Sequence, residues 1–129
     1  MNILLWILQG VLAMMMFMPG IMKLMNNNEQ LIKKGNGSMD WVEDLSGSSV
    51  KIIGLLEVLA AIGLILPHLL GILPILTPIA AIGVVLTMLG ALALHFKRKD
   101  ELKALVVNFV ILFIAAFVAY GRFVLVPAL

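Results

Sequence analysis

The 129-residue sequence contains no cysteine, which excludes disulfide bonds, thiol catalysis, iron–sulfur clusters and cysteine-based zinc sites. Charge is also scarce: charged residues make up 12%, against about 25% in soluble domains. Hydrophobic residues reach 63%, so the composition indicates an integral membrane protein. The net charge is only +2 and the basic residues are scattered, so no nucleic-acid partner is expected.

The sequence also lacks the short motifs that identify common active sites. It has no GxSxG, P-loop, GxGxxG or HExxH pattern, and no haem, flavin or metal motif. His68 and His95 are expected near opposite membrane faces, which argues against haem held between them. Glu57 and His95 suit acid–base chemistry, or a metal with a third ligand, but neither spacing is diagnostic. The nine methionines are more typical of flexible core packing than of metal transport.

Four apolar segments have the length of membrane-spanning helices. The sequence therefore predicts an all-α fold, an integral membrane four-helix bundle formed as a single domain over residues 1–129. Pro67 and Gly71 are expected to end the second helix, and Pro74 to begin the third. The first segment lacks a basic n-region and a cleavage site, so we expect it to remain as a membrane helix. The predicted helices cover residues 3–25, 50–66, 74–96 and 102–126.

The long polar segment, residues 26–49, lies between the first two predicted helices. Ser38 could cap a short amphipathic turn containing Met39, Trp41, Val42 and Leu45, which would rest on the membrane surface or cover the end of the bundle. A loosely ordered loop is the other interpretation.

The orientation follows from the positions of lysine and arginine, which favour cytoplasmic loops. Arg122 is the one basic residue near the other ends of the helices. The N- and C-termini are therefore predicted on the outer side and the basic loops in the cytoplasm. The eight residues flanking the first and third loops are Lys23, Lys33, Lys34, Lys51, Lys97, Arg98, Lys99 and Lys103.

Each predicted helix carries one polar residue in its cytoplasmic third: Lys23, Glu57, His95 and Asn108. Glu57 lies roughly 9 Å past Lys51 at the helical rise per residue. Ionisable residues inside spans are costly, so they mark candidate functional sites. Pairing Glu57 with Lys23 would compensate both charges, and His95 and Asn108 would complete the hydrogen bonding. Two interpretations are open: a polar clamp that fixes the bundle, or a ligand or proton site.

A second polar layer is expected near the outer side, with Gln9, Tyr120 and Arg122 at comparable depth. For Tyr120 and Arg122, and likewise for Trp6, the favoured interpretation is an anchor at the membrane interface. At the other end of the first helix, Pro19 could bend the chain or be tolerated in a nearly straight helix.

The order of four sequence stretches resembles the DoxX-like family of small bacterial membrane proteins over nearly the full chain. These stretches are GIMKL, GLLEVLAAIGLILP, LTPIAAIGVVLTMLGALALHFKRKDE and NFVILFIAAFVAYGRF. The resemblance implies a four-helix bundle in the bacterial cytoplasmic (inner) membrane and weak links to membrane redox processes, without a defined reaction. Pro19 is a less familiar residue before the first family glycine. The positions that the resemblance picks out are Gly20, Lys23, Gly54, Glu57, His95, Asn108, Tyr120, Gly121 and Arg122.

Three functional hypotheses follow. The first is an accessory or ligand-binding membrane subunit whose polar pocket, built from Lys23, Glu57, His95 and Asn108, takes a lipophilic molecule such as a quinone. The second is a membrane enzyme or proton-coupled carrier in which Glu57 exchanges protons. The third is a structural assembly subunit. Membrane lipids are expected partners, and a homo-oligomer or a redox complex would fit the large lipid-facing surface.

Overall fold

A computed structural model describes residues 1–127 of the chain. These residues are almost entirely helical, with 85% helix and no strand among them, which confirms the all-α prediction. The elements are α1 (Asn2–Met25), α2 (Asn28–Gly35), the 3₁₀-helix η1 (Asp40–Asp44), α3 (Gly47–Leu70), α4 (Leu76–Arg98), α5 (Leu102–Tyr120) and the π-helical turn η2 (Gly121–Leu125).

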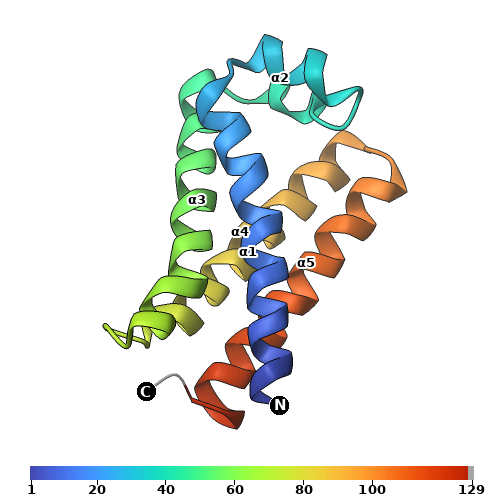
Figure 1. The fold of residues 1–129 in the computed structure, drawn as a ribbon. Helices are drawn as coiled ribbons and strands as arrows, with labels where there is room; N and C mark the ends of the chain where they lie inside the picture. The colour runs from blue at the N-terminus through green and yellow to red at the C-terminus, as the bar shows by residue number, and fades with distance from the viewer. Residues whose placement is uncertain (128–129) are drawn as a thin grey trace.

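Four helices are long and apolar enough to cross a membrane: α1, α3, α4, and α5 together with η2. Many of their large apolar side chains point outward, as expected where lipid rather than water surrounds the bundle. The N-terminus and the end of the described chain lie at one end of the bundle, and α2 lies at the other (Figure 1). The distribution of lysine and arginine continues to predict that the α2 end is cytoplasmic.

Helix α3 is longer than the predicted span over residues 50–66 and passes through Pro67. Proline has no backbone N–H, so the carbonyl of Gly63 loses its donor within the helix. Thr77 on α4 replaces that donor, because its hydroxyl donates to the Gly63 carbonyl at 2.9 Å. The prediction that Pro67 ends the helix is therefore wrong. Gly71 ends it, as predicted, with a left-handed φ of 68°.

The ends of the last two spans also differ from the prediction. Helix α4 begins at Leu76, so Pro74 precedes it, and Pro78 falls in the first turn, where a missing N–H costs nothing. It continues to Arg98, two residues past the predicted end at 96. The predicted helix over 102–126 is α-helical only to Tyr120, and the π turn η2 replaces its last turn.

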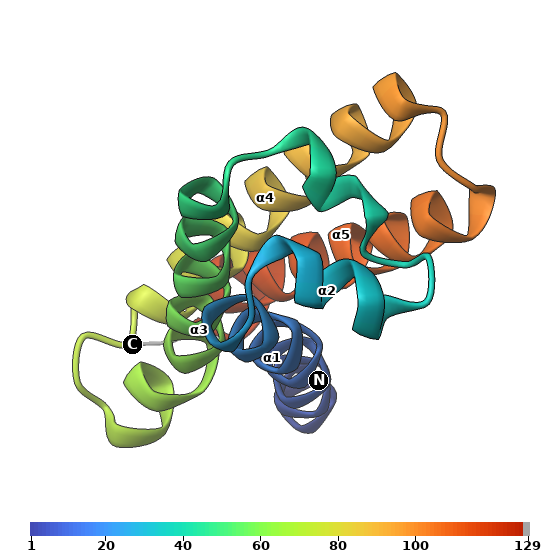
Figure 2. The same cartoon turned by 90° about the horizontal axis from the view of Figure 1, so that it is seen from above.

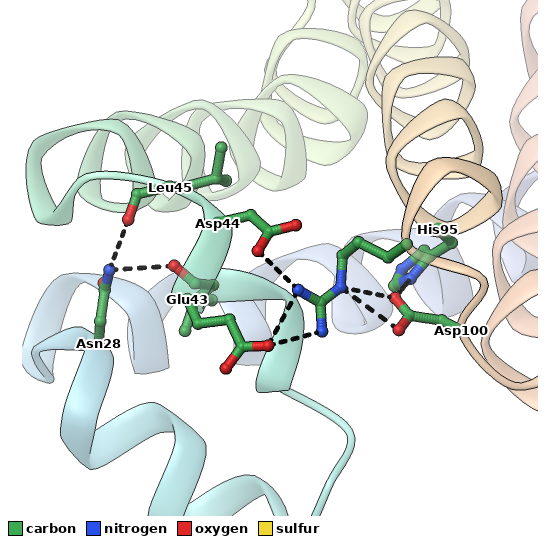
Figure 3. Close-up of polar contacts among 8 residues, drawn as sticks. Asn28, Glu43, Asp44, Leu45, His95 and Asp100 are labelled. Carbon is green, nitrogen blue, oxygen red and sulfur yellow. Dashed lines mark hydrogen bonds and ion pairs between the residues drawn. The ribbon is translucent and has the colours of Figure 1, made fainter.

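The segment between α1 and α3 is folded into a short cover rather than a loose loop. The Asn27 and Gln30 side chains form a reciprocal capping box at the start of α2. Asn28 donates hydrogen bonds to the carbonyls of Val42 and Leu45 and so holds η1 against α2 (Figure 3). Ser38, expected to cap a turn, instead donates to the Gly35 carbonyl. We call residues 28–45 the cover; its small core consists of Leu31, Val42 and Val50 with Ile32, Met39, Trp41 and Leu45 around them.

The four long helices pack as two pairs, α1 with α3 and α4 with α5, joined mainly through α3 and α4. Toward the α2 end the two pairs diverge, and the cover lies over that end (Figures 1 and 2). The main core therefore occupies the middle and the opposite end of the bundle, and the α2 end is left open for a site. This core contains Leu12, Met16, Ala61, Leu64, Ala81, Val84, Met88, Ile111, Ala115, Val118 and Ala119.

Candidate functional site

Lys23 and Glu57 form an ion pair between α1 and α3. The Nζ atom of Lys23 donates to Oε1 of Glu57 at 2.6 Å. The two side chains are only 5% and 7% exposed, so the pair is buried in the protein rather than extended to the interface. The pairing predicted from the sequence is confirmed, and Lys23 is not a snorkelling anchor.

Two glycines bring the helices carrying this pair close together. A Cβ atom on Gly54 would lie 2.7 Å from the Cβ of Lys23, and one on Gly20 would lie 2.9 Å from the Gly54 carbonyl oxygen. Each glycine is three residues before a member of the pair, so the helix crossing lies one turn from the charges. Close backbone approach through small residues is the usual way that membrane helices pack tightly.

Pro19 lies beside this crossing, and α1 is assigned as one helix from Asn2 to Met25 through it. The proline leaves the carbonyl of Met15 without its usual helical donor. At the end of α1, the ammonium of Lys51 donates to the carbonyls of Leu24 and Asn26 at 3.1 and 3.2 Å. Lys51 thus caps α1 from α3 and fixes the ends of the two helices relative to each other.

A cavity of about 1120 Å³ lies between the two helix pairs, below the cover. This volume is slightly larger than the roughly 300–1,000 Å³ of most small-molecule sites. All four polar residues predicted for the site line it: Lys23, Glu57, His95 and Asn108. Much of the remaining wall is apolar, including Met15, Met16, Ile53, Leu56, Leu86, Met88, Ala91, Leu94, Val107 and Ile111.

The structure brings His95 and Asn108 to the cavity but does not bond them to the ion pair. The Nδ1 atom of His95 lies 2.6 Å from Oδ2 of Asp100, so the expectation that His95 completes the bonding of Glu57 is wrong. Asn108 makes no side-chain hydrogen bond to another residue within 1–127, and its side chain is partly exposed at the cavity wall. Its amide is therefore available to both donate to and accept from a molecule in the cavity.

Trp41 is a cavity residue that the sequence analysis did not assign to the site. It belongs to η1, and its ring centre lies 5.4 Å from the Nζ atom of Lys23. The same ring meets the imidazole of His95 edge-on at 6.4 Å. Trp41 thus links the cover to two of the predicted site residues and places an aromatic ring at the cavity mouth. The contact with Lys23 has the geometry of a cation–π interaction, and it exists only because the cover folds over the bundle.

Arg98, used in the sequence analysis only for orientation, fastens the cover to α4. Its guanidinium lies 3.2 Å from Glu43 and 2.9 Å from Asp44 in η1, and 3.1 Å from Asp100 (Figure 3). The hydrogen bond with His95 holds the pKa of the Asp100 carboxyl below its usual range, and the hydrogen bond and positive charge of Arg98 lower this pKa further. Arg98 and Asp100 therefore connect the cover, His95 and the end of α4 into one charged network.

The predicted second layer is also a buried cluster, at the end of the bundle opposite α2. The Nε atom of Arg122 donates to Oε1 of Gln9 at 2.6 Å, and Gln9 donates to the Leu64 carbonyl at 2.7 Å. Arg122 is only 1% exposed, so the favoured interpretation of an interfacial anchor is wrong for this residue. Tyr120 is 54% exposed and lies outside the cluster, as an anchor would.

The polar groups of the Lys23–Glu57 ion pair, whose charges cancel, can form hydrogen bonds with a molecule in the cavity. The ammonium of Lys23 uses one of its three donors on Glu57, and the second oxygen of Glu57 makes no hydrogen bond within the described chain. Among residues 1–127 no group of three or more histidine, cysteine, aspartate or glutamate side chains is placed to hold a metal ion.

Comparison with known proteins gives one family match. No curated protein and no solved structure matches the chain significantly. The model of the DoxX-like family matches residues 7–118, which cover two of the four candidate spans in full, most of the other two, and all four polar residues of the cavity. The chain belongs to the DoxX-like family and is a multi-pass membrane protein.

Proposed function

We propose that this protein binds a neutral, lipophilic small molecule of the quinone class in the cavity below the cover. The carrying observation is that a large, mainly apolar cavity contains a buried ion pair with unused donors and an unused acceptor. A pocket that is apolar apart from a few converging polar groups is the usual form of a small-molecule site.

The charge of the site supports a neutral head group. Eight charged side chains line the cavity, four of each sign: Lys23, Arg98, Lys99 and Lys103 against Asp40, Glu57, Asp100 and Glu101. The cavity wall therefore has no excess charge, and Lys23 and Glu57 already compensate each other, which favours a neutral head group beside the buried pair. A carbonyl can accept from Lys23, and a hydroxyl can donate to the second oxygen of Glu57. Asn108 offers both a donor and an acceptor on the opposite helix pair. Quinones and quinols present carbonyl or hydroxyl oxygens across one ring and so match this arrangement.

The residues that line the cavity suit a ligand with a planar head group and an apolar tail. The indole ring of Trp41 offers a flat face at the cavity mouth for a second ring. The methionines Met15, Met16 and Met88 are flexible and polarisable, which suits an aromatic guest. The lysine and arginine pattern predicts that this head-group site lies near the cytoplasmic side of the membrane.

The test is extraction of bound quinone from protein purified in detergent. We expect organic extracts of the wild type to contain prenylquinone in proportion to protein, and Glu57→Gln to retain much less. Ala91→Trp, which fills the cavity wall, should lose it as well. Gly83→Ala is the matched control, because a Cβ atom there meets nothing within 4 Å. Equal quinone in all four proteins, or none in any, would reject the proposal.

A structural clamp is the second candidate function, favoured by the position of the ion pair beside the Gly20–Gly54 crossing. A clamp predicts that Glu57→Gln lowers stability without any bound small molecule in the wild type. The extraction and a stability measurement on the same samples therefore separate the two candidates.

A further inference from the structure

The cluster around Arg122 has an unexplained excess of positive charge. Its guanidinium is 1% exposed, yet none of the residues 1–127 supplies a carboxylate within ion-pair distance of it. Its three partners are neutral: the side-chain oxygens of Gln9 and Asn2 and the backbone carbonyl of Val126. Removing an uncompensated charge from water costs several kcal/mol, so such a residue is expected to have a counter-charge.

Two buried atoms in the cluster also lack hydrogen-bond partners. The Nη2 atom of Arg122 and the Nδ1 atom of His68 are both buried and unbonded in the described chain. Trp6 contacts both side chains: its ring lies 5.4 Å from the guanidinium carbon and stacks on the imidazole at 4.6 Å. Nearly all buried polar atoms in native proteins have a partner, so these two atoms call for an explanation, which a bound ion or a water molecule can supply.

The local backbone keeps Arg122 in this position. Gly121 and Arg122 begin the π turn η2, and such turns are rare and often found at functional sites. A Cβ atom on Gly121 would collide with the terminal methyl groups of buried Leu5, so a larger residue here would require Leu5 to shift. The bundle therefore directs the guanidinium inward at a specific place, against the cost of burying it.

From these observations we propose that Arg122 binds an oxyanion, a phosphate or carboxylate group, at the end of the bundle opposite α2. This site is separate from the Lys23–Glu57 cavity and does not depend on the function proposed for it. Within residues 1–127, Nη2 has no hydrogen-bond partner and Nη1 donates only to Asn2 and Val126, so one oxyanion can accept from both nitrogens of the planar fork. The Trp6 ring borders the guanidinium on another side.

Asn2 lies between Arg122 and the protein surface, on the route that we expect an oxyanion to take. The Oδ1 atom of Asn2 accepts from Nη1 at 2.8 Å, and Asn2 itself is an exposed residue. An oxyanion that takes the place of this amide oxygen therefore enters from the surface and meets Nη1 first, with Nη2 beside it. The phosphate of a phospholipid head group and a free anion share this chemistry, and both are present at a membrane surface.

Tryptophan fluorescence tests the proposal directly, because the chain has only two tryptophans. In a Trp41→Phe background, Trp6 is the sole tryptophan and lies against Arg122. Protein in dodecyl maltoside, which has no phosphate, is titrated with inorganic phosphate and separately with dihexanoylphosphatidylglycerol at constant ionic strength. We expect a saturable change in Trp6 emission. A response to phosphate identifies a free oxyanion as a ligand, and a response to the phospholipid alone identifies the head group.

Two variants in the same background make the test specific. Arg122→Lys keeps the charge but loses the fork, and should weaken binding by about tenfold or more. Asn2→Asp changes an exposed residue and places a carboxylate beside Nη1, so it should abolish the response while preserving or raising thermal stability. No response to either titrant, or a response unchanged in Asn2→Asp, would overturn the proposal.

Discussion

The ammonium of Lys23 lies 2.6 Å from the carboxylate of Glu57, one helical turn from the point where α1 and α3 touch through Gly20 and Gly54. The same two side chains form part of the wall of a cavity that is bordered by the cover. The same pair of residues therefore contributes both to the packing of α1 against α3 and to the candidate binding site.

Removing one charge of the pair should destabilise the protein far more than removing both. Lys23→Met leaves the buried carboxylate of Glu57 without a counter-charge, and Glu57→Gln leaves the buried ammonium of Lys23 without one. Loss of one partner of a buried ion pair typically costs about 3–5 kcal/mol. In Lys23→Met/Glu57→Gln no charge remains, so we expect most of that loss to be recovered. Equilibrium unfolding in mixed micelles gives the free energies for the double-mutant cycle. Additive losses would show that the two residues do not interact energetically.

Adding a methyl group at the helix crossing should separate α1 from α3. In Gly54→Ala the new Cβ would lie 2.7 Å from the Cβ of Lys23, a contact that only a backbone shift relieves. Overpacking of this kind typically costs about 1–3 kcal/mol. Gly10→Ala is the control on α1, where nothing lies within 4 Å and alanine favours the helix. Thermal unfolding should rank Gly54→Ala below and Gly10→Ala at or above the wild type; equal melting temperatures would contradict the close crossing.

The hydroxyl of Thr77 should be needed only because Pro67 removes a backbone donor. Thr77→Val leaves the Gly63 carbonyl unbonded and should cost about 1–2 kcal/mol. In a Pro67→Ala background the alanine N–H can donate to that carbonyl, so the same substitution should cost much less. Chemical unfolding of the four proteins measures the coupling. An identical loss in both backgrounds would show that the threonine acts in another way.

The charged network of Asp100 with His95 and Arg98 at the end of α4 should weaken in acid. The pKa of Asp100 is lowered in the folded protein, so its carboxylate contributes stability that is present above its ordinary pKa of about 4. This contribution is lost as the pH falls through the lowered folded-state value. The melting temperature of the wild type should therefore fall more steeply below pH 4 than that of Asp100→Asn. Parallel curves of melting temperature against pH for the two proteins would show that the Asp100 carboxylate does not stabilise this network.

The sequence was sufficient for the spans and for the Lys23–Glu57 pair because both follow from local rules. Apolar length predicts the helices, and opposite charges at equal depth in an apolar medium have few other partners. The resemblance to the DoxX-like family pointed to the same positions. The end of α3 was mispredicted because Thr77, on another helix, supplies the bond that Pro67 removes.

The parts that sequence reasoning missed depend on tertiary contacts. Trp41 joins the site only because the cover folds back over the bundle, held by Asn28 and Arg98. The capping box of Asn27 and Gln30 was the local signal for α2, and it lay within a stretch that otherwise resembles a series of turns. Arg122 lies at the depth of an interfacial anchor, and only the π turn and Gln9 show that it faces inward.

Fluorescence of Trp41 tests the central claim most directly. In a Trp6→Phe background Trp41 is the sole tryptophan, and its ring lines the cavity. Titration with decylubiquinone in detergent should quench its emission to a saturating limit, and Glu57→Gln in the same background should shift the titration to higher quinone. In the control Trp41→Phe, Trp6 should show only linear quenching by dissolved quinone. Saturable quenching that depends on Glu57 is the predicted result; linear and equal quenching of both tryptophans would contradict a quinone site beneath the cover.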